Sequence, residues 1–259
     1  MDLRSLLLLL LAPCLRASYV SQSRAPTTKA TRPSHLVRAR VVSSTAGNAA
    51  TVATTREALP NELSNVATLQ LEIFAPPPEP PSLLPMLQAM FEASERNARN
   101  GMQTRLTQEL ELRVERGSEI IVAVATDVEE AAVVDASGSY TEPGPQLLGS
   151  VDVSVQELQL PTHAIAGGMY LSHMAVAEVA RRQGVGRSLL SAADECALRR
   201  GEDTIYLHVE KDNAAAIALY EISGYKRQPE VPPYVGFTQA LNLQERAFLY
   251  AKELRVGDE

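Results

Sequence analysis

The chain of 259 residues lacks tryptophan, and only 5% of its residues are aromatic. Proteins that bind single-stranded nucleic acid stack the bases on aromatic side chains, so we expect no nucleic-acid partner. Cysteine is scarce as well. Cys14 and Cys196 are too few and too far apart for a disulfide framework or a zinc site. Because the four histidines show no metal-ligand spacing either, we expect no metal.

Acidic residues are missing from residues 18–56, which hold six basic residues and 13 serines and threonines. This composition is typical of an organelle transit peptide and cannot bury enough apolar surface to fold. Before it, the run Leu6–Leu11 with Ala17 beyond resembles a signal peptide and is too short to span a bilayer. We therefore interpret residues 1–60 as a disordered targeting presequence, signal-like over 1–17 and transit-like over 18–60.

A leucine-rich signal followed by an acid-free segment resembles the two-part presequences that reach plastids through the secretory route. A plastid, such as a chloroplast, is therefore the expected location. A secretory signal, a mitochondrial presequence and a plain disordered tail are the alternatives. The remaining body, residues 61–259, is expected to form one folded domain that has no membrane attachment after processing.

The net charge of −7 is divided unevenly along the chain. Residues 1–56 hold eight basic residues and one acid, whereas residues 57–259 hold 16 basic and 30 acidic residues. An acidic body repels polyanions and attracts cations. Lysine side chains, protein amino termini and polyamines all fit this charge as partners.

Hydrophobic periodicity predicts an α+β (mixed α/β) domain in which helices flank a sheet. The pattern Glu119–Thr126 and Leu147–Val155 indicates two strands of a hairpin with a long acidic connection. The helices and the other strands are assigned from apolar spacing and from glycine and proline breaks. Strands are expected at Ala67–Phe74, Gly168–Val176, Thr204–Val209 and Arg246–Leu254, and helices at Leu83–Asn97, Gly101–Arg116, Gly184–Arg200 and Asn213–Ser223.

The segment with the clearest chemical use is Arg181-x-x-Gly184-x-Gly186, between an expected strand and an expected helix. The first turn of a helix has unpaired N–H groups and the positive end of the helix dipole, so it can bind a pyrophosphate. Glycines let the phosphate oxygens approach the backbone. No Gly-Lys-Ser/Thr follows, and Leu189 occupies the third glycine position of a dinucleotide fold, so neither of those two motifs is present.

Residues Leu171–Tyr225 resemble the GCN5-related N-acetyltransferase (GNAT) superfamily at several spaced points. The matching segments are Met174-Ala175-Val176, the turn Arg181-x-x-Gly184-x-Gly186, His208-Val209-x-x-x-Asn213, and Ala218-Leu219-Tyr220-Glu221-x-x-Gly224-Tyr225. The resemblance implies a mixed sheet that splays into a V between residues 168–176 and 204–209, with acetyl-CoA as co-substrate. It implies contacts to pantetheine from Met174, Ala175 and Val176, to pyrophosphate from Arg182, Gln183, Gly184, Val185, Gly186 and Arg187, and to the cofactor arm from Asn213.

The same resemblance implies that Tyr220 is the general acid that protonates the departing thiolate of coenzyme A. His208 occupies the position at which the similar ribosomal-protein alanine N-acetyltransferases carry a glutamate base, and an imidazole can do the same work. Tyr234 follows two prolines in a segment that borders the acceptor entrance in peptide-acetylating relatives. His173 and Glu210 are weaker candidates. Ser172 and His173 are expected on opposite faces of a strand, because side chains alternate.

The sequence thus predicts an acetyl-CoA-dependent N-acetyltransferase that acts on protein amino termini, lysine side chains or both. Residues around Tyr170–Ser172 and Tyr206–Val209 also resemble the plastid N-acetyltransferases of plants. An enzyme for a small cationic amine such as a polyamine is the first alternative, and a catalytically silent acyl-CoA-binding module is the second. The oligomeric state is not predicted.

Overall fold

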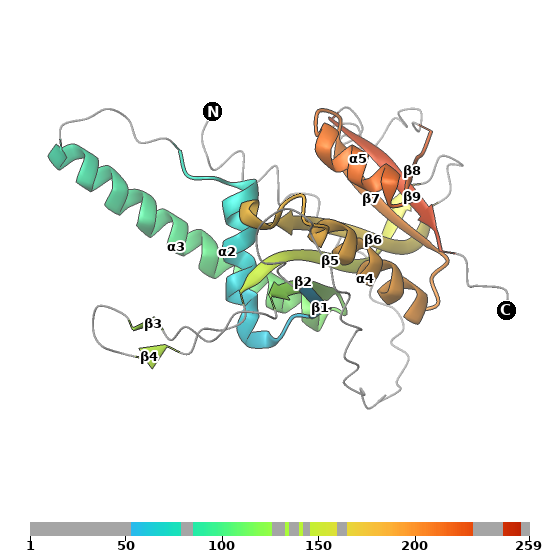
Figure 1. The fold of residues 1–259 in the computed structure, drawn as a ribbon, viewed down its shortest axis with the longest axis horizontal. Coiled ribbons are helices and arrows are strands. Elements are labelled where there is room, and N and C mark those ends of the chain that lie inside the picture. The colour runs from blue at the N-terminus through green and yellow to red at the C-terminus, as the bar shows by residue number, and fades with distance from the viewer. Residues whose placement is uncertain are drawn as a thin grey trace.

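A seven-stranded mixed sheet forms the centre of the protein in a computed structural model that describes residues 53–78, 85–125, 133–134, 140–141, 146–159, 165–229 and 246–254. The strand order is β1-β2-β5-β6-β7-β9-β8, and only β6 and β7 pair in parallel (Figure 1). The expected α+β class and the expected hairpin of β2 and β5 are confirmed. The strands are β1 (Ala53–Glu57), β2 (Glu119–Ala125), β5 (Leu147–Gln159), β6 (Ile165–Val176), β7 (Thr204–Glu210), β8 (Lys226–Arg227) and β9 (Ala247–Glu253), with a separate pair of β3 (Val133–Val134) and β4 (Tyr140–Thr141).

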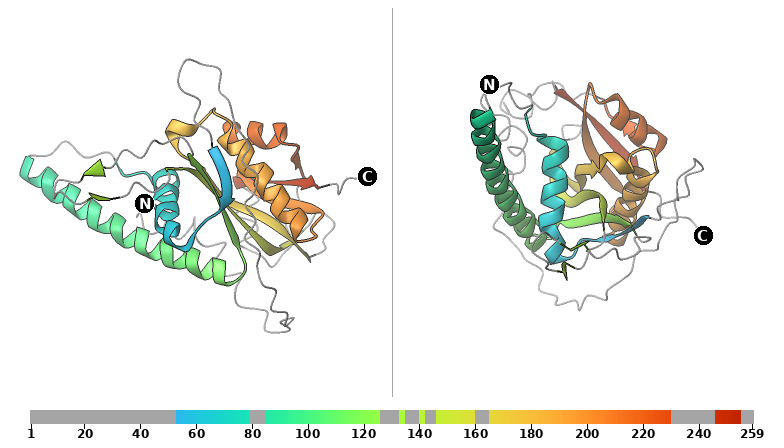
Figure 2. Two further views of the ribbon diagram at one scale, coloured as in Figure 1. Left: turned by 60° about the horizontal axis from the view of Figure 1, so that its bottom comes forward. Right: turned by 60° about the vertical axis from the view of Figure 1, so that its left-hand side comes forward.

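Helices cover both faces of the sheet. Successive side chains of a strand point to opposite faces, and in the central strands both sets of side chains are largely apolar. Along β2, Ile120, Val122 and Val124 face α2 (Leu63–Phe74) and α3 (Pro85–Glu115). Ile121, Ala123 and Ala125 belong to the larger core on the opposite face, with α4 (Val185–Arg199) and α5 (Ala214–Ile222) (Figure 2). We call these the α2/α3 face and the α4/α5 face. None of the helices in the described ranges is both long and apolar enough to cross a membrane.

The prediction of a strand at Ala67–Phe74 is wrong, because this segment is the helix α2. The buried positions Leu63, Val66, Ala67, Gln70 and Leu71 recur at intervals of three and four, which is the spacing of one helix face. Of the alternating residues Leu69, Leu71 and Ile73, which suggested a strand, only Leu71 belongs to this face. The helix packs on β5 and β6 and ends before the prolines 76–78.

The two helices expected at Leu83–Asn97 and Gly101–Arg116 form one continuous helix, α3. Gly101 does not break it, because the glycine has an ordinary helical φ and no neighbour lies within 4 Å of the position of its missing Cβ. Only the second half of α3 packs on the sheet, through Leu106 and Leu110, while the first half extends away from the body (Figure 1).

The folded region begins earlier than residue 61, which corrects the domain boundary. Ala53–Glu57 forms the edge strand β1, which pairs with β2 over five residues. Arg56 closes this strand by donating hydrogen bonds of 2.6 and 2.5 Å to Glu62, and the pKa of Glu62 is lowered by this guanidinium. The remainder of the predicted presequence, residues 1–52, lies outside the described residues.

Candidate functional site

The parallel strands β6 and β7 separate after three residue pairs. Their pairing covers Met169–Leu171 and Ile205–Leu207, yet β6 continues to Val176 and β7 to Glu210. Each strand keeps its other neighbour along this stretch, since β6 pairs with β5 and β7 pairs with β9. Within the described strands, residues 172–176 therefore have no ladder partner on the β7 side, which confirms the expected splay.

A bulge interrupts β6 where the two strands begin to separate. Asp152 pairs with Ser172, and the next pair is Ser150 with Ala175, so β6 holds one residue more than β5. His173 adopts a left-handed φ of 48° at this point. The prediction that Ser172 and His173 lie on opposite faces is wrong, because the bulge breaks the alternation and brings His173 Nδ1 within 3.1 Å of Ser172 Oγ.

The turn after β6 leads into α4, whose first turn has no side-chain cap. Arg182 has a φ of 63° and Gly184 a φ of 86°, so the chain reverses sharply before Val185 begins the helix. No side chain caps the N terminus of α4, and the first amides of an uncapped helix together with its dipole attract anions. Arg181, Arg182 and Arg187 are exposed around this turn.

A side chain at position 186, in the first turn of α4, would be in tight contact with its neighbours. A Cβ at this position would lie 3.0 Å from Leu219 Cδ2 on α5 and 3.2 Å from Met174 Cε on β6. The glycine therefore allows α4, α5 and the unpaired end of β6 to meet closely. The turn predicted for pyrophosphate and the strand end predicted for pantetheine, Met174–Val176, are brought together by this packing.

Tyr220 lies on α5 against the unpaired end of β6. Its phenol is buried, with 7% of the residue exposed, and Oη is 3.7 Å from Sδ of Met174. Burial raises the pKa of Tyr220 to about 12, so the phenol keeps its proton at any physiological pH. The structure thus brings the predicted acid to the predicted pantetheine strand.

Asn213 forms the N-cap of α5. Its Oδ1 accepts a hydrogen bond of 3.0 Å from the backbone N–H of Ala216, and the side chain is exposed at the end of β7. The side-chain oxygen of Asn213 therefore takes part in the cap. The amide nitrogen is the part of Asn213 that remains for the predicted contact with the cofactor.

His208 lies on β7, one residue beyond the last pair with β6. Its Nδ1 is 2.9 Å from Oη of Tyr170, and the two rings are in contact. Burial lowers the pKa of His208 to about 4. The imidazole is therefore neutral at pH 7 but only weakly basic. Tyr234 lies outside the described residues.

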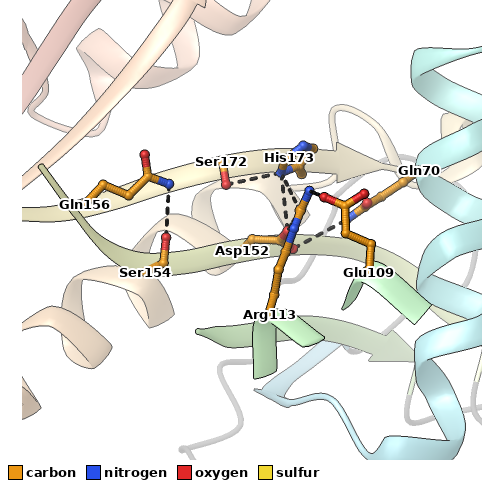
Figure 3. A network of polar contacts seen from close by, with 8 residues as sticks. All are labelled: Gln70, Glu109, Arg113, Asp152, Ser154, Gln156, Ser172 and His173. Carbon is orange, nitrogen blue, oxygen red and sulfur yellow. Dashed lines mark hydrogen bonds and ion pairs between the residues drawn. The ribbon is translucent and has the colours of Figure 1, made fainter. Parts of the chain in front are cut away.

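An ionic network on the α2/α3 face was not predicted from the sequence (Figure 3). Asp152 of β5 is 2% exposed and accepts a hydrogen bond of 2.9 Å from Arg113 of α3, which also binds Glu109 at 2.5 Å. Nδ1 of His173 lies 3.3 Å from Asp152 Oδ2 and 3.2 Å from Arg113 Nη1. The available signal was an aspartate inside the apolar run LLGSVDVSV, since a buried acid requires a partner.

Comparison with known proteins finds similarity over the segment that forms this site. Residues 142–225 match the model of the acetyltransferase (GNAT) family. The chain is 40% identical to GCN5-related N-acetyltransferase 6, chloroplastic, of Arabidopsis thaliana over 57 residues, which are 22% of this chain and 20% of that protein. It is 41% identical to the [ribosomal protein bS18]-alanine N-acetyltransferase of Escherichia coli K12 over 64 residues, 25% of this chain and 43% of that protein. The matched segments thus span less than half the length of either relative.

A crystal structure of the PaiA N-acetyltransferase from Thermoplasma acidophilum, in complex with coenzyme A, superposes with a TM-score of 0.46 and 14% identity over 78% of this chain and 98% of that chain. The match to the family model falls on the segment that forms the site. Residues 142–225 include the splayed strands, the turn before α4, and α5 with Tyr220. Over this segment, about a third of its length, the chain is similar to the acetyltransferase (GNAT) family.

Proposed function

We propose that the chain transfers the acetyl group of acetyl-CoA to a primary amine, with protein amino termini or lysine side chains as acceptors. One observation carries the proposal. The unpaired end of β6, the uncapped start of α4 and the buried phenol of Tyr220 meet at one place, where Gly186 keeps α4 and α5 close together. An extended thioester that ends in a pyrophosphate needs these three features side by side.

The residues present fit acetyl-CoA. Backbone groups of Met174, Ala175 and Val176 lack a ladder partner on the β7 side and are suited to the amides of pantetheine. The segment Arg182–Arg187 offers uncapped amides and exposed arginines to the pyrophosphate. When bound, acetyl-CoA supplies an electrophilic thioester carbonyl and a thiolate leaving group.

Tyr220 is the proposed acid for that leaving group. Its pKa of about 12 makes it a weaker acid than a free thiol, whose pKa is near ~8.5. The phenol therefore first donates a hydrogen bond to the departing sulfur, and transfer of the proton completes the step. Burial favours this role, because a hydrogen bond in a site with little water stabilises developing charge more strongly than one in water.

Two observations support a cationic amine as acceptor. Residues 57–259 hold 30 acidic and 16 basic residues, so the body attracts ammonium groups. The relative from Escherichia coli is named for the acetylation of an alanine of ribosomal protein bS18. The same charge favours a small polyamine, which is the second candidate. The chloroplastic relatives and the composition of residues 18–56 together support a plastid as the location.

The test is an assay of thiol release by the purified full chain with acetyl-CoA and three acceptors of equal concentration. These are a peptide with a free amino terminus and no lysine, an acetyl-capped peptide with one lysine, and spermidine. We expect thiol release and a mass increase of one acetyl group with at least one peptide. Release with spermidine alone favours the second candidate. Tight binding of acetyl-CoA without release for any acceptor contradicts the proposal and indicates a binding module.

A further inference from the structure

The bulge in β6 determines which face of the sheet the side chain of Met174 occupies. Before the bulge, Met169 and Leu171 point into the larger core on the α4/α5 face, and strict alternation would send the even-numbered positions to the opposite face. Because β6 holds one residue more than β5 at the bulge, Met174 packs against that same core. The thioether therefore lies on the face of the sheet that carries Tyr220.

The side chain of Met174 contacts both parts of the proposed site. Its Sδ lies 3.7 Å from Oη of Tyr220, which donates a hydrogen bond to it. Its Cε lies beside the first turn of α4, 3.2 Å from the place that a Cβ on Gly186 would occupy. One side chain thus touches the proposed acid and the turn that is proposed to bind the pyrophosphate.

The hydroxyl of Tyr220 is buried with a weak acceptor. Tyr220 is 7% exposed, and among the residues that the structure describes the thioether of Met174 is its hydrogen-bond partner. A buried hydroxyl needs an acceptor, and a thioether is a weak one. Hydrogen bonds to charged acceptors are about twice as strong as those between neutral groups. A sulfur that develops negative charge therefore takes the hydroxyl from the thioether.

The ring of Tyr220 is held by a second aromatic residue, Tyr225. The two ring centroids are 5.8 Å apart and the planes meet at 62°, which is an edge-to-face contact. Tyr225 is itself fixed, because it is 2% exposed and its hydroxyl donates a hydrogen bond of 3.1 Å to Asp194 of α4. With the ring fixed, rotation about the C–O bond of Tyr220 determines where its proton points.

We propose that Met174 is a positioning residue whose thioether orients the hydroxyl of Tyr220 for the departing thiolate of coenzyme A. The inference rests on the proposed acetyl transfer and gives a role to a side chain whose backbone is proposed to contact pantetheine. When the C–S bond breaks, its electron pair stays on the sulfur of coenzyme A. That sulfur takes the proton of Tyr220 to give a free thiol, and the phenolate regains a proton from solvent. The thioether forms and breaks no covalent bond.

A double-mutant cycle tests whether Met174 acts through Tyr220. Leucine has nearly the volume of methionine but no acceptor atom, so we expect Met174→Leu to lower kcat about fivefold with the acceptor that the wild-type chain acetylates. In the Tyr220→Phe background no hydroxyl is left to orient, and the same substitution should leave kcat unchanged. An equal loss in both backgrounds overturns the inference, because packing alone would then explain it. Full turnover of either single variant overturns it as well.

Met169→Leu is the matched control. Met169 lies on the same strand and in the same core, is fully buried, and pairs with Ile205 in the part of β6 that still has β7 as its neighbour. We expect this variant to keep the kcat of the wild-type chain. A loss equal to that of Met174→Leu contradicts the inference, since repacking of the core would then account for both.

Met174→Gln tests whether the acceptor has to be weak. The amide oxygen is a stronger acceptor than the thioether and holds the hydroxyl more firmly, so we expect kcat to fall about tenfold below that of the wild-type chain. The dissociation constant of acetyl-CoA should stay the same, because backbone groups are proposed to bind pantetheine. Wild-type kcat with weaker binding of acetyl-CoA overturns the inference, because the side chain of Met174 would then only pack on α4.

The hydrogen bond is also measured without turnover. Tyrosine labelled with ¹³C at Cζ gives a signal for each of the eight tyrosines of the full chain, and Tyr220→Phe identifies that of Tyr220. We expect this signal to shift in Met174→Leu and in Met174→Gln and to stay in place in Met169→Leu. An unchanged signal in both variants of Met174 overturns the inference while the proposed function stands. A wild-type chain that is inactive with every acceptor refutes the proposed function itself, whatever the signal shows.

Discussion

Among the residues that the structure describes, the hydroxyl of Tyr220 has one hydrogen-bond partner, the thioether of Met174, which is a weak acceptor. This hydroxyl therefore contributes little to folding. We expect Tyr220→Phe to keep the melting temperature and the affinity for acetyl-CoA and to lower kcat about 100-fold. Equilibrium binding and steady-state kinetics on the same preparation separate the two quantities. Unchanged turnover would show that another group protonates the sulfur.

Burial of His208 makes the stability of the fold depend on pH. Its pKa is about 4 in the folded chain and near ~6.5 when unfolded, because burial disfavours the charged form. The unfolded chain therefore binds more protons between these values, and stability that is present above pH 6.5 is lost as the pH falls toward 4. The shift corresponds to about 3 kcal/mol.

We expect His208→Gln to remove this part of the acid sensitivity. Urea denaturation at pH 7 and at pH 4.5 should show a smaller loss of the free energy of unfolding in the variant than in the wild-type chain. The comparison of the two chains cancels the effect of the carboxylates, which titrate in both. An equal loss in both chains would mean that His208 is solvated in the folded state.

The site residues that belong to one continuous segment could be predicted from the sequence. Those that tertiary packing brings next to this segment could not. The turn before α4, Asn213 and Tyr220 follow one another within a short stretch, so their spacing is visible in the sequence. Arg113 and Asp152 are 39 residues apart and meet through the packing of α3 on the sheet. The position of His173 depends on a bulge, in which β6 has one residue more than its partner β5. The residue pattern of a single strand does not predict such an insertion.

At the scale of elements, α5 shows how one residue serves both folding and the site. The cap of Asn213 on Ala216 fixes the start of a helix of nine residues. We expect Asn213→Ala to lower the free energy of unfolding by about 1 kcal/mol. Asn213→Ser is the matched control, because serine restores the cap.

Serine does not replace the amide nitrogen, so the two variants separate the roles of Asn213. If the amide contacts the cofactor, both variants bind acetyl-CoA more weakly than the wild-type chain, although only Asn213→Ala is less stable. Calorimetric titration with acetyl-CoA and urea denaturation measure the two effects. Normal binding by Asn213→Ser would restrict Asn213 to capping.

The elements that were predicted correctly show a clear local pattern in the sequence, such as alternation of apolar residues or a glycine turn. The strand Thr204–Glu210 alternates buried and half-buried residues, and α4 begins at a glycine turn. The helix α2 was mistaken for a strand because its buried residues face β5 and β6, which follow about 80 residues later. A short apolar segment does not by itself distinguish a buried helix from a strand.

At the scale of the whole molecule, the two faces of the sheet have different roles. The α4/α5 face holds the proposed cofactor turn and Tyr220, whereas the α2/α3 face holds the network around His173 (Figures 1 and 3). Both groups of residues lie near the end of β6, where that strand separates from β7. The larger core on the α4/α5 face joins α4 and α5 to six strands and so anchors the proposed cofactor turn.

The edge strand β1 is the first element of the described fold. It contributes Ala53 and Thr55, both almost fully buried, and the ion pair of Arg56 with Glu62. Removal of residues 1–60 deletes five pairs with β2 and exposes the edge of that strand. Each lost hydrogen bond contributes about 1 kcal/mol, so we expect the melting temperature to fall by roughly 10 °C.

Removal of residues 1–52 is the matched control, because it leaves β1 and its contacts intact. We expect this shorter deletion to keep the melting temperature of the full chain and its rate of thiol release. Thermal denaturation of the three chains, with light scattering to detect association through the exposed β2 edge, measures the difference. If both deletions behave alike, β1 adds nothing to the fold, and the boundary at residue 60 is restored.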